Sequence, residues 1–501
     1  MPEEIKCPVG HNGKPLLKPS IWKILSRDVK SVICTLAAEN EVIHAEDAAL
    51  KKRIEELEEK LRASSRNSSK PPSSDPPDKK DNKKKKKGKG KKRRPGGQPG
   101  HEAHTRELLP PEEVDKFVRC DPVKQCDCGG EVEVDEEQEA QHLQTLEIPS
   151  LKPYVSQYDQ YFGICCRCGK HHPGKLPEGV GEDMLGPRAK AIVSILSGKY
   201  HLSKRGIQEI MHDFFGIELS LGSVSNTEAR VSDALAEPVE EAKEHVKDQK
   251  VANLDESGWR EKKKRAWLWV AVTTAVTVFI IRCSRGAKVA RELLGEDPGI
   301  VISDRFSAYN YLDPQGRQLC WAHLERDFIK LMERGGASEG IGEALLEYSD
   351  SMFKWWHRVR DGTMSRKKFA KKMEPVRRKV EALLEYGTVC GHSKTQETCK
   401  EILKVRDALW TFIDVRGVEP TNNAAERAIR PAVLWRKRSF GTESQRGSLF
   451  VERMMTVGAT CKQQDRNVLD YVTCAIKAHM NHRQAPSLVP GQQLVQIPLA
   501  A

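Results

Sequence analysis

The stretch VANLDESGWREKKKRAWLWVAVTTAVTVFIIRCSRGAKVARELLGEDPGIVISD, residues 251–304, decides the fold class. Its runs of apolar and β-branched residues predict four strands and one helix, the strands at residues 250–259, 267–273, 276–282 and 299–303 and the helix at 286–294. Strands interrupted by a helix in this way indicate a mixed α/β sheet. The sequence therefore predicts an α/β (α+β) core in this part of the chain.

Two acidic residues lie at or near the carboxyl ends of predicted strands, Asp255 near the end of the first and Asp304 at the end of the last. Taken alone, an aspartate at a strand end is more often a turn residue or a cap. Two carboxylates brought together are costly unless a cation lies between them. Mg²⁺ (or Mn²⁺) accepts oxygen ligands and keeps positions open for phosphate. The pair therefore predicts a divalent-metal site.

A third acid, Glu426, lies in the segment TNNAAERAIRP at residues 421–431. The segment predicts a helix that starts near Thr421 and ends by Pro431, with Asn422 and Arg430 on the face of Glu426. A cluster of cations with interleaved aromatic residues continues from it, typical of nucleic-acid binding: Arg427, Arg430, Arg436, Lys437 and Arg438, with Trp435 and Phe440. Glu426 alone would most often be a surface charge.

The formal net charge of +12 comes almost entirely from one segment, because twelve of the sixteen residues from Lys79 to Arg94 are lysine or arginine. Residues 64–101 contain no apolar anchor and predict a disordered Pro/Ser/Lys-rich linker. Its cations would contact DNA phosphates, as represented by Lys83, Lys84, Lys85, Arg93 and Arg94. A solubilising spacer is the alternative.

The N-terminal region carries a short repeat of apolar residues. Ile43, Leu50 and Leu57 recur every seven residues, with Ile54 and Leu61 offset by four, which predicts a coiled-coil helix over residues 39–63. An amphipathic helix that packs on its own protein is an equal alternative. Residues 1–38 carry no motif that we can interpret.

Six cysteines cluster in residues 115–175, where Cys165-x-x-Cys168-Gly is a good half of a zinc site and Cys126-x-Cys128-Gly-Gly is a less regular one. With strands expected over 132–149 and 154–162, the segment predicts a zinc-ribbon-like module that binds Zn²⁺. Scattered core cysteines are the alternative.

Residues 186–248 predict helices. Ser203 precedes one helix that ends at Gly216, and Ser220–Ser223 offers a cap for the next, near residues 221–234. Two short helices around a glycine turn are similar to a helix-turn-helix, although such pairs are also common as plain packing elements.

The chain shows no targeting or membrane signal. Its start, MPEEIK, has acids where a signal peptide needs bases, and the apolar run at 266–281 is shorter than the ~20 residues of a spanning helix. We expect a cytoplasmic, nucleoid-associated protein without membrane contact.

From about Glu39 to Lys477 the sequence resembles transposases of the insertion sequence 66 family. The resemblance rests on these motifs: RNSSKPPSSD at 66–75, GGQPGH at 96–101, LDESGWR at 254–260, SDRFSAY at 303–309, CWAHLERDF at 320–328, TNNAAERAIRP at 421–431 and LWRKRSFGTESQRGS at 434–448. It implies a DDE-type enzyme with an RNase H-like core, split into residues 249–326 and 416–480 by a helical insertion at 327–415 and followed by a tail at 481–501.

Carried over residue by residue, the family's acidic triad falls on Asp255, Asp304 and Glu426. Cys320-x-x-His323 is similar to an element of related transposases, which implies that His323, near Arg326, orients the scissile phosphate; a strand-end histidine packed in the core is the alternative. The chain departs from the family at the first zinc pair, where Gln125 stands in place of a cysteine that is shifted to Cys126.

The resemblance implies Mg²⁺-dependent cleavage of double-stranded DNA at element ends and joining to a target, by a homo-oligomer, with accessory proteins of the same element as possible partners. Two alternatives come from the residues themselves. One is a non-catalytic DNA-binding regulator, and the other is a hydrolytic nuclease on the same core.

Overall fold

The computed structural model describes residues 6–9, 14–62, 67, 107–181 and 183–491. Of the predicted basic linker, only Asn67 is among the described residues. Its predicted DNA-contacting cations therefore lie outside the described residues: Lys83, Lys84, Lys85, Arg93 and Arg94. The chain divides into two compact units, one comprising Met1–Lys79, Pro177–Leu202 and Ser225–Ala501, the other Lys80–Leu176 and Ser203–Val224.

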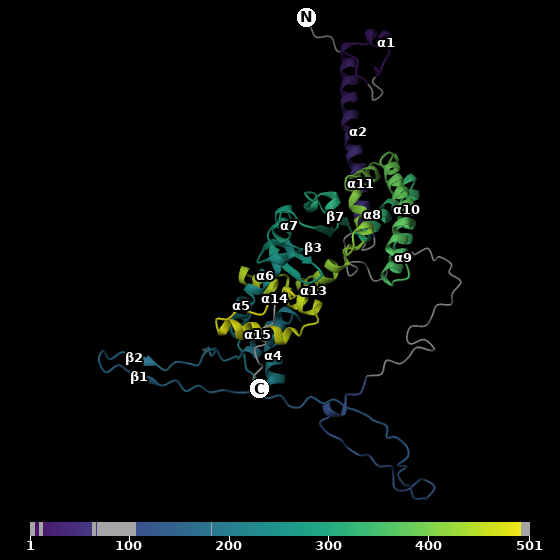
Figure 1. The fold of residues 1–501 in the computed structure, drawn as a ribbon. Coiled ribbons are helices and arrows are strands. Elements are labelled where there is room, and N and C mark those ends of the chain that lie inside the picture. The colour runs from purple at the N-terminus through teal and green to yellow at the C-terminus, as the bar shows by residue number, and fades with distance from the viewer. Residues whose placement is uncertain (1–5, 10–13, 63–66, 68–106, 182, 492–501) are drawn as a thin grey trace. The chain divides into compact units, whose positions relative to one another are not determined.

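The described residues are rich in helix (Figure 1). The α-helices are α1 (Pro19–Ile24), α2 (Arg27–Arg62), α3 (Pro187–Gly198), α4 (Lys204–Phe215), α5 (Leu221–Ala234), α6 (Ala236–Lys247), α7 (Ala287–Leu294), α8 (Trp321–Glu333), α9 (Ala337–Arg360), α10 (Arg366–Gly387), α11 (Ser393–Leu403), α12 (Thr411–Asp414), α13 (Asn423–Ser439), α14 (Gln445–Gln463) and α15 (Val468–Met480). The 3₁₀ helices are η2 (Pro111–Glu113), η3 (Ser307–Tyr309), η4 (Pro314–Gly316) and η5 (Arg406–Leu409). The strands are β1 (Phe162–Ile164), β2 (His171–Pro173), β3 (Val251–Glu261), β4 (Lys264–Val272), β5 (Thr277–Arg282), β6 (Ile300–Ser303) and β7 (Arg317–Leu319).

A five-stranded mixed sheet with the order β5-β4-β3-β6-β7 forms the centre of the larger unit. β3, β4 and β5 pair antiparallel, whereas β6 pairs parallel with β3 and β7 pairs parallel with β6. The four predicted strands and the helix between them are confirmed, and the apolar run at 266–281 forms most of β4 and β5. Within the described part of the chain, no helix has the length and apolar character to cross a membrane.

The alternation of side chains along β3 separates the two faces of the sheet. Ala252 and Leu254 belong to the core that α3, α5, α6, α7 and α15 build with α14. Trp259 belongs to the opposite core, which α13 covers together with α14. By this two-residue period, Asp255 faces the side of α13 and Glu256 faces the other.

Side chains of α14 complete the hydrogen bonding of the edge strand β5. Three residues spaced by four along the helix accept from three alternate backbone N–H groups of the strand: Thr460 Oγ1 from Thr277 at 3.1 Å, Thr456 Oγ1 from Phe279 at 3.0 Å and Glu452 Oε1 from Ile281 at 2.8 Å. The spacing works because two strand residues and four helix residues each advance by roughly 6–7 Å. An edge that would otherwise be open to pairing is thereby closed.

Thr456→Val keeps the shape of this contact but removes the acceptor for the buried Phe279 N–H group. We expect the free energy of unfolding to fall by about 1–3 kcal/mol, because the donor stays buried without a partner. Urea titration measures it. Thr456→Ser retains the hydroxyl and should lose less; equal losses for the two variants would contradict the role of the hydrogen bond.

The segment after β7 is helical, as predicted, and has its own apolar core. Residues of α8–α11, with η5 and α12, pack around Trp321, Phe369 and Trp410, and Ile302 and Leu319 of the sheet join the same cluster. α9 and α10 run side by side in this segment (Figure 1). This helical segment therefore packs against the sheet through β6 and β7.

The predicted N-terminal helix is longer than expected, because α2 starts at Arg27 and not near residue 39. The heptad residues Ile43, Leu50, Ile54 and Leu57 are all exposed. The coiled coil and the helix that packs on its own protein both stay predictions.

In the cysteine-containing segment, the strands expected at 132–149 and 154–162 do not form in the described residues, except that Phe162 begins β1. Pairing in this segment consists of the hairpin of β1 and β2 around the second cysteine pair and one isolated antiparallel bridge, Gln125 to Glu131, around the first. The prediction failed because β-propensity needs a partner strand, and the segment has no apolar face that would fix one.

The two helices of the predicted helix-turn-helix are confirmed at α4 and α5. Ser203 caps α4 by accepting from Gly206 N, and Gly216 ends it with φ of 64°. Val231 and Ala234 of α5 lie in the core beneath the sheet. The role of α5 in reading DNA stays a prediction.

Candidate active site

Asp255 and Asp304 come from neighbouring parallel strands. The pairing of β3 with β6 ends at Asn253, two residues before Asp255, and Asp304 directly follows β6. Asp255 was predicted near the end of its strand, but it lies in the middle of β3. The strand continues to Glu261 because it pairs antiparallel with β4. The two acids meet because parallel strands direct their carboxyl ends to the same edge.

The three predicted acids interact electrostatically. Burial raises the pKa of the Asp255 carboxyl well above its usual range, and the nearby charges of Glu256, Asp304 and Glu426 raise it further. The Glu256 backbone N–H, which donates to Asp255 Oδ1 at 2.9 Å, opposes this. Crowded carboxylates of this kind take up a cation readily, because the cation removes their mutual repulsion.

The loop that carries Asp304 is held by a buried arginine. Arg317 of β7, 1% exposed, donates to the carbonyls of Asp304 at 2.6 Å and Tyr309 at 3.3 Å and to Ser303 Oγ at 3.2 Å. Burial lowers the pKa of this guanidinium to about 10. Asp304 Oδ1 in turn accepts from Phe306 N at 2.9 Å, which fixes the carboxylate within the loop.

Glu426 lies in the first turn of α13, and Asn422 attaches that end of the helix to the sheet. The Asn422 side chain donates to the Leu254 carbonyl at 2.8 Å and accepts from Asn253 at 3.0 Å. The predicted start of the helix is confirmed, but its predicted end at Pro431 is wrong, since α13 continues to Ser439. Pro431 is exposed, so water can satisfy the carbonyl that lacks a partner.

A cysteine and a histidine lie beside Glu426. Cys320 caps α8 and its Sγ lies 4.0 Å from Glu426 Oε1, while Nδ1 of His323 in the first turn lies 3.5 Å from the same oxygen. Burial and the charge of Arg326 lower the pKa of His323, and the charges of Asp304 and Glu426 oppose this shift. His323 is therefore a helix residue that faces the acids, not the strand-end residue expected as the alternative.

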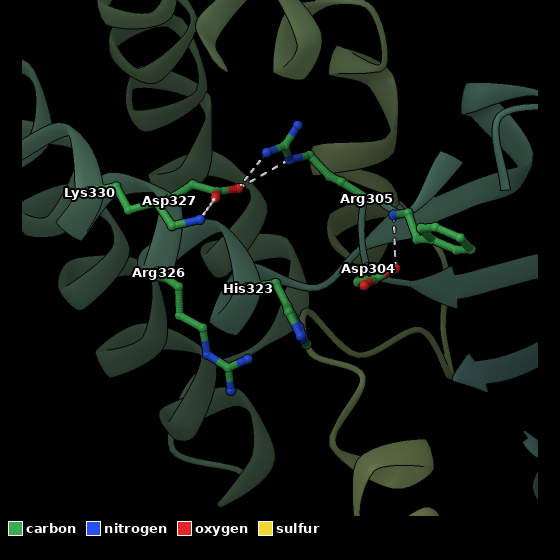
Figure 2. A pocket seen from close by; sticks show the side chains of 7 residues that line it. Asp304, Arg305, His323, Arg326, Asp327 and Lys330 are labelled. Carbon is green, nitrogen blue, oxygen red and sulfur yellow. Dashed lines mark hydrogen bonds and ion pairs between the residues drawn. The ribbon is translucent and has the colours of Figure 1, made fainter. Parts of the chain in front are cut away.

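A pocket of about 150 Å³ opens beside Asp304. Figure 2 shows His323 and Arg326 extending from α8 into this region, with Asp304 opposite them. Arg305 and Lys330 also line the pocket, but both are paired with Asp327. Arg326 makes no hydrogen bond or ion pair to any described residue, so its charge remains available for an anionic ligand.

Glu256 occupies the other face of β3, where its buried side chain has two partners. Its carboxylate accepts from Tyr309 Oη and from Arg285 at 2.6 Å, and the Arg285 guanidinium lies 3.7 Å from the ring centre of Phe306. Burial raises the pKa of Glu256, and the charge of Asp304 adds to it. The contacts of Glu256 with Tyr309 and Arg285 therefore support the loop that carries Asp304.

The raised pKa of Glu256 predicts how stability changes with pH. The folded state holds this proton more strongly than the unfolded state, so the contribution is full below the unfolded pKa and is lost as pH rises through the folded pKa. Glu256→Gln removes this titration, so its stability relative to wild type should increase as pH rises above the ordinary glutamate pKa of 4.5. Urea titration in EDTA measures the difference, with the exposed Glu296→Gln as control. A difference independent of pH would contradict the assignment.

The predicted cations of α13 separate into two groups. Arg427, Arg430, Lys437 and Arg438 are exposed along the helix. Arg436 instead donates to Ser257 Oγ at 3.2 Å and to the Gly258 carbonyl, so its guanidinium is used within the fold. The two predicted aromatic residues also differ, because Trp435 stacks on His201 at 4.5 Å whereas Phe440 is exposed.

Each predicted zinc half forms a tight turn. Gly129 N donates to the Cys126 carbonyl and Gly169 N donates to the Cys165 carbonyl, each at 2.8 Å, with both glycines at positive φ. Backbone N–H groups, chiefly that of Gly130, lower the pKa of Cys128. Within the described residues, however, the two turns do not bring three cysteine sulfurs together.

The structure brings Asp255 into electrostatic range of Asp304 and Glu426, and Asp304, His323 and Arg326 line one pocket. Among the described residues, the carboxylate oxygens of the three acids are not a group that lies close enough together to hold a metal ion. Sequence reasoning missed Glu256, Arg317 and Tyr309, which hold the acids in place. A glutamate next to Asp255 and a tyrosine in SDRFSAY were visible, but nothing in their spacing showed that the chain brings them into contact.

Comparison with known families assigns this chain to the transposases. Residues 183–449, more than half of the chain, match the model of the transposase IS66 family, and the chain belongs to that family. Residues 23–107 match a family of unknown function, DUF6444.

One curated relative is an uncharacterized protein, y4qI, of Sinorhizobium fredii (strain NBRC 101917 / NGR234). It is 30% identical over 241 residues, which cover 42% of this chain and 43% of the relative. The chain thus spans less than half the length of the curated relative it matches.

Proposed function

We propose that the protein is a DDE-type transposase that cleaves DNA at element ends and joins them to target DNA with Mg²⁺ or Mn²⁺. The observation that carries the proposal is the electrostatic coupling of Asp255, Asp304 and Glu426, which come from two strands and a helix far apart in the sequence. The strand order, with three antiparallel strands followed by two parallel ones, also supports an RNase H-like core.

The donor set fits a hard divalent cation, because three carboxylates supply only oxygen ligands and repel one another without it. Asp255, Asp304 and Glu426 would hold the metal. When bound, two such ions supply the activation of a water or a DNA 3′-hydroxyl and the stabilisation of the leaving oxygen.

The other residues of the site hold and orient the substrate. Arg326, which has no described partner, would bind the scissile phosphate, and His323 would position it from the neighbouring helical turn. The exposed cations Arg427, Arg430 and Arg438 would contact the flanking DNA backbone, and Phe440 offers a ring on which a displaced base can stack. Asn422 and Arg317 fix Glu426 and Asp304 respectively.

A strand-transfer assay tests the proposal. Purified protein is incubated with a labelled donor fragment carrying the DNA that flanks the coding sequence, a supercoiled target and Mg²⁺, with EDTA as control. We expect both nicked donor and donor–target joint products. Cleavage without joining would identify a hydrolytic nuclease, whereas binding without metal-dependent nicking would identify a DNA-binding regulator.

We also infer that the cysteine-containing segment binds Zn²⁺ through Cys126, Cys128, Cys165 and Cys168. The inference rests on the two turns, in which backbone N–H groups lower the pKa of Cys128 and Cys165 and so favour the thiolates that zinc requires. Binding would draw the two turns together, because a structural zinc ion needs four ligands.

Metal analysis tests this site. The purified wild-type protein should contain about one zinc ion per chain at the cysteine turns, and the double variant Cys165→Ser, Cys168→Ser should lose it. Cys166→Ser, in the same turn but outside the ligand set, should retain it. Equal zinc content in the two variants would contradict the ligand assignment.

A further inference from the structure

We propose that Cys320, His323 and Glu426 form a binding site for a borderline-soft transition metal ion of the Zn²⁺ type, distinct from the magnesium site but sharing Glu426 with it. This inference rests on the proposed function, because it gives Glu426 two competing uses. Among the described residues, these three are the group of metal-binding side chains whose ligand atoms converge, all within 4.8 Å of one another.

The separations of the ligand atoms suit a tetrahedral ion. Bonds of ~2.0–2.3 Å from nitrogen, oxygen and sulfur to zinc place the ligand atoms roughly 3.3–3.6 Å apart. In the structure, Glu426 Oε1 lies 3.5 Å from His323 Nδ1 and 4.0 Å from Cys320 Sγ. The ligand atoms of Cys320 and His323 lie within 4.8 Å of each other, so these side chains must close by about 1 Å at most to complete the geometry.

The ligand types select the ion. Thiolate, imidazole and carboxylate together suit Zn²⁺ or Co²⁺, whereas Mg²⁺ prefers oxygen ligands and is a poor partner for sulfur. Three protein ligands leave the fourth position to water, as in open zinc sites. On binding, the metal–sulfur bond replaces the S–H bond of Cys320, and the proton passes to solvent.

The surroundings of the ligands support metal binding independently of the distances. His323 Nδ1 is buried and has no hydrogen-bond partner among the described residues, and it lies 3.5 Å from Glu426 Oε1. Cys320 Sγ accepts from the Asn422 backbone N–H at 3.2 Å, a contact that stabilises a coordinated thiolate. Two backbone hydrogen bonds hold the start of α8 in place. Cys320 N donates to the Ser303 carbonyl of β6 at 2.9 Å, and Trp321 N donates to the Pro420 carbonyl, just before α13, at 2.8 Å.

Occupancy of this site would stop catalysis. Glu426 is drawn toward Cys320 and cannot complete the magnesium site with Asp255 and Asp304, and His323 can no longer contact the scissile phosphate. Zn²⁺ would therefore act as an inhibitor that competes for one carboxylate, and the enzyme would cut DNA only where free zinc is scarce relative to magnesium.

Co²⁺ is the probe for direct binding, because thiolate–Co²⁺ charge-transfer absorption reports a cysteine ligand without any activity measurement. The full chain with Cys126, Cys128, Cys165 and Cys168 replaced by serine removes the other candidate site. In that background we expect charge-transfer bands that Zn²⁺ abolishes and Mg²⁺ does not. Adding Cys320→Ser should remove the bands, and adding Cys399→Ser, at another buried cysteine, should not.

A second variant distinguishes the loss of a metal ligand from the loss of the fold. His323→Asn should shift the bands and weaken binding by about 10-fold or more, equivalent to about 1.4 kcal/mol for one lost ligand, while circular dichroism verifies the fold. Bands that are unchanged by Cys320→Ser, or absent from the starting background, would overturn the proposal.

Inhibition is measured with each variant normalised to its own rate in Mg²⁺ alone. The Zn²⁺ concentration for half-inhibition should rise about 10-fold or more in Cys320→Ser relative to Cys399→Ser. Equal sensitivity would overturn the competition for Glu426. The two hypotheses can fail separately. If the protein shows Cys320-dependent bands but does not cleave DNA, the transposase mechanism alone is refuted. If it cleaves DNA but shows no such bands, the zinc site alone is refuted.

Discussion

Asp255→Asn is expected to lower the rate of Mg²⁺-dependent DNA cleavage by at least ~1,000-fold, equivalent to ~4 kcal/mol of transition-state stabilisation. Asp255 is the acid whose pKa is raised by burial and by all the other carboxylates of the site, including Asp304 and Glu426. Its neutral isostere would relieve that repulsion and remove the charge that a cation requires. The apoprotein should therefore be as stable as wild type, or more so, although it is inactive.

Single-turnover cleavage of a labelled fragment measures the loss, and a filter-binding assay measures DNA affinity, which should change little. Asp297→Asn is the matched control, because Asp297 is an exposed aspartate of the same unit and lies outside the metal site. Strand transfer by Asp255→Asn at a rate comparable to this control would refute the assignment of the acidic triad.

Neutralising the basic run is expected to have the second large effect. Twelve cations lie between Lys79 and Arg94, and we expect about half of them to contact phosphates. Replacing all twelve with glutamine should flatten the slope of log affinity against log salt concentration by ~5 and lower affinity at low salt by ~1,000-fold or more. The physical reason is counterion release, which the neutral segment no longer provides.

Fluorescence anisotropy over a range of salt concentrations measures this slope. A variant in which the lysines of the run become arginines keeps the charge and the length, and it should retain the wild-type slope. If the glutamine variant also retains it, the basic run does not touch DNA and acts as a spacer.

Local patterns were sufficient for the strands and for most helix ends. β4 and β5 follow from a β-branched run that is too short for a membrane helix, and α4 follows from a serine cap and a terminal glycine. These features depend on neighbours in the chain, which the sequence displays directly. The predicted end of α13 was wrong, because the helix continues through Pro431, whose exposure lets water satisfy the carbonyl that lacks a partner.

The prediction of an acidic site from two strand acids and a helical glutamate was possible because each acid had a recognisable local setting. The way in which the acids are held was not predictable. Arg317 and Glu256 look like ordinary charged residues in the sequence, yet both side chains are buried. Arg317 donates to the Asp304 carbonyl, and Glu256 accepts from Tyr309 in the same loop. A long-range hydrogen bond leaves no periodic trace in a sequence.

By itself the sequence determined the class of the core, the three candidate acids and the family, since these reside in composition, periodicity and contiguous motifs. Only the tertiary structure decided that Asn422 attaches α13 to β3 and that Cys320 and His323 converge on Glu426. The reason is physical: a chain records which residues are adjacent along it, whereas burial, ligand geometry and competition for one carboxylate arise only after distant segments have packed together.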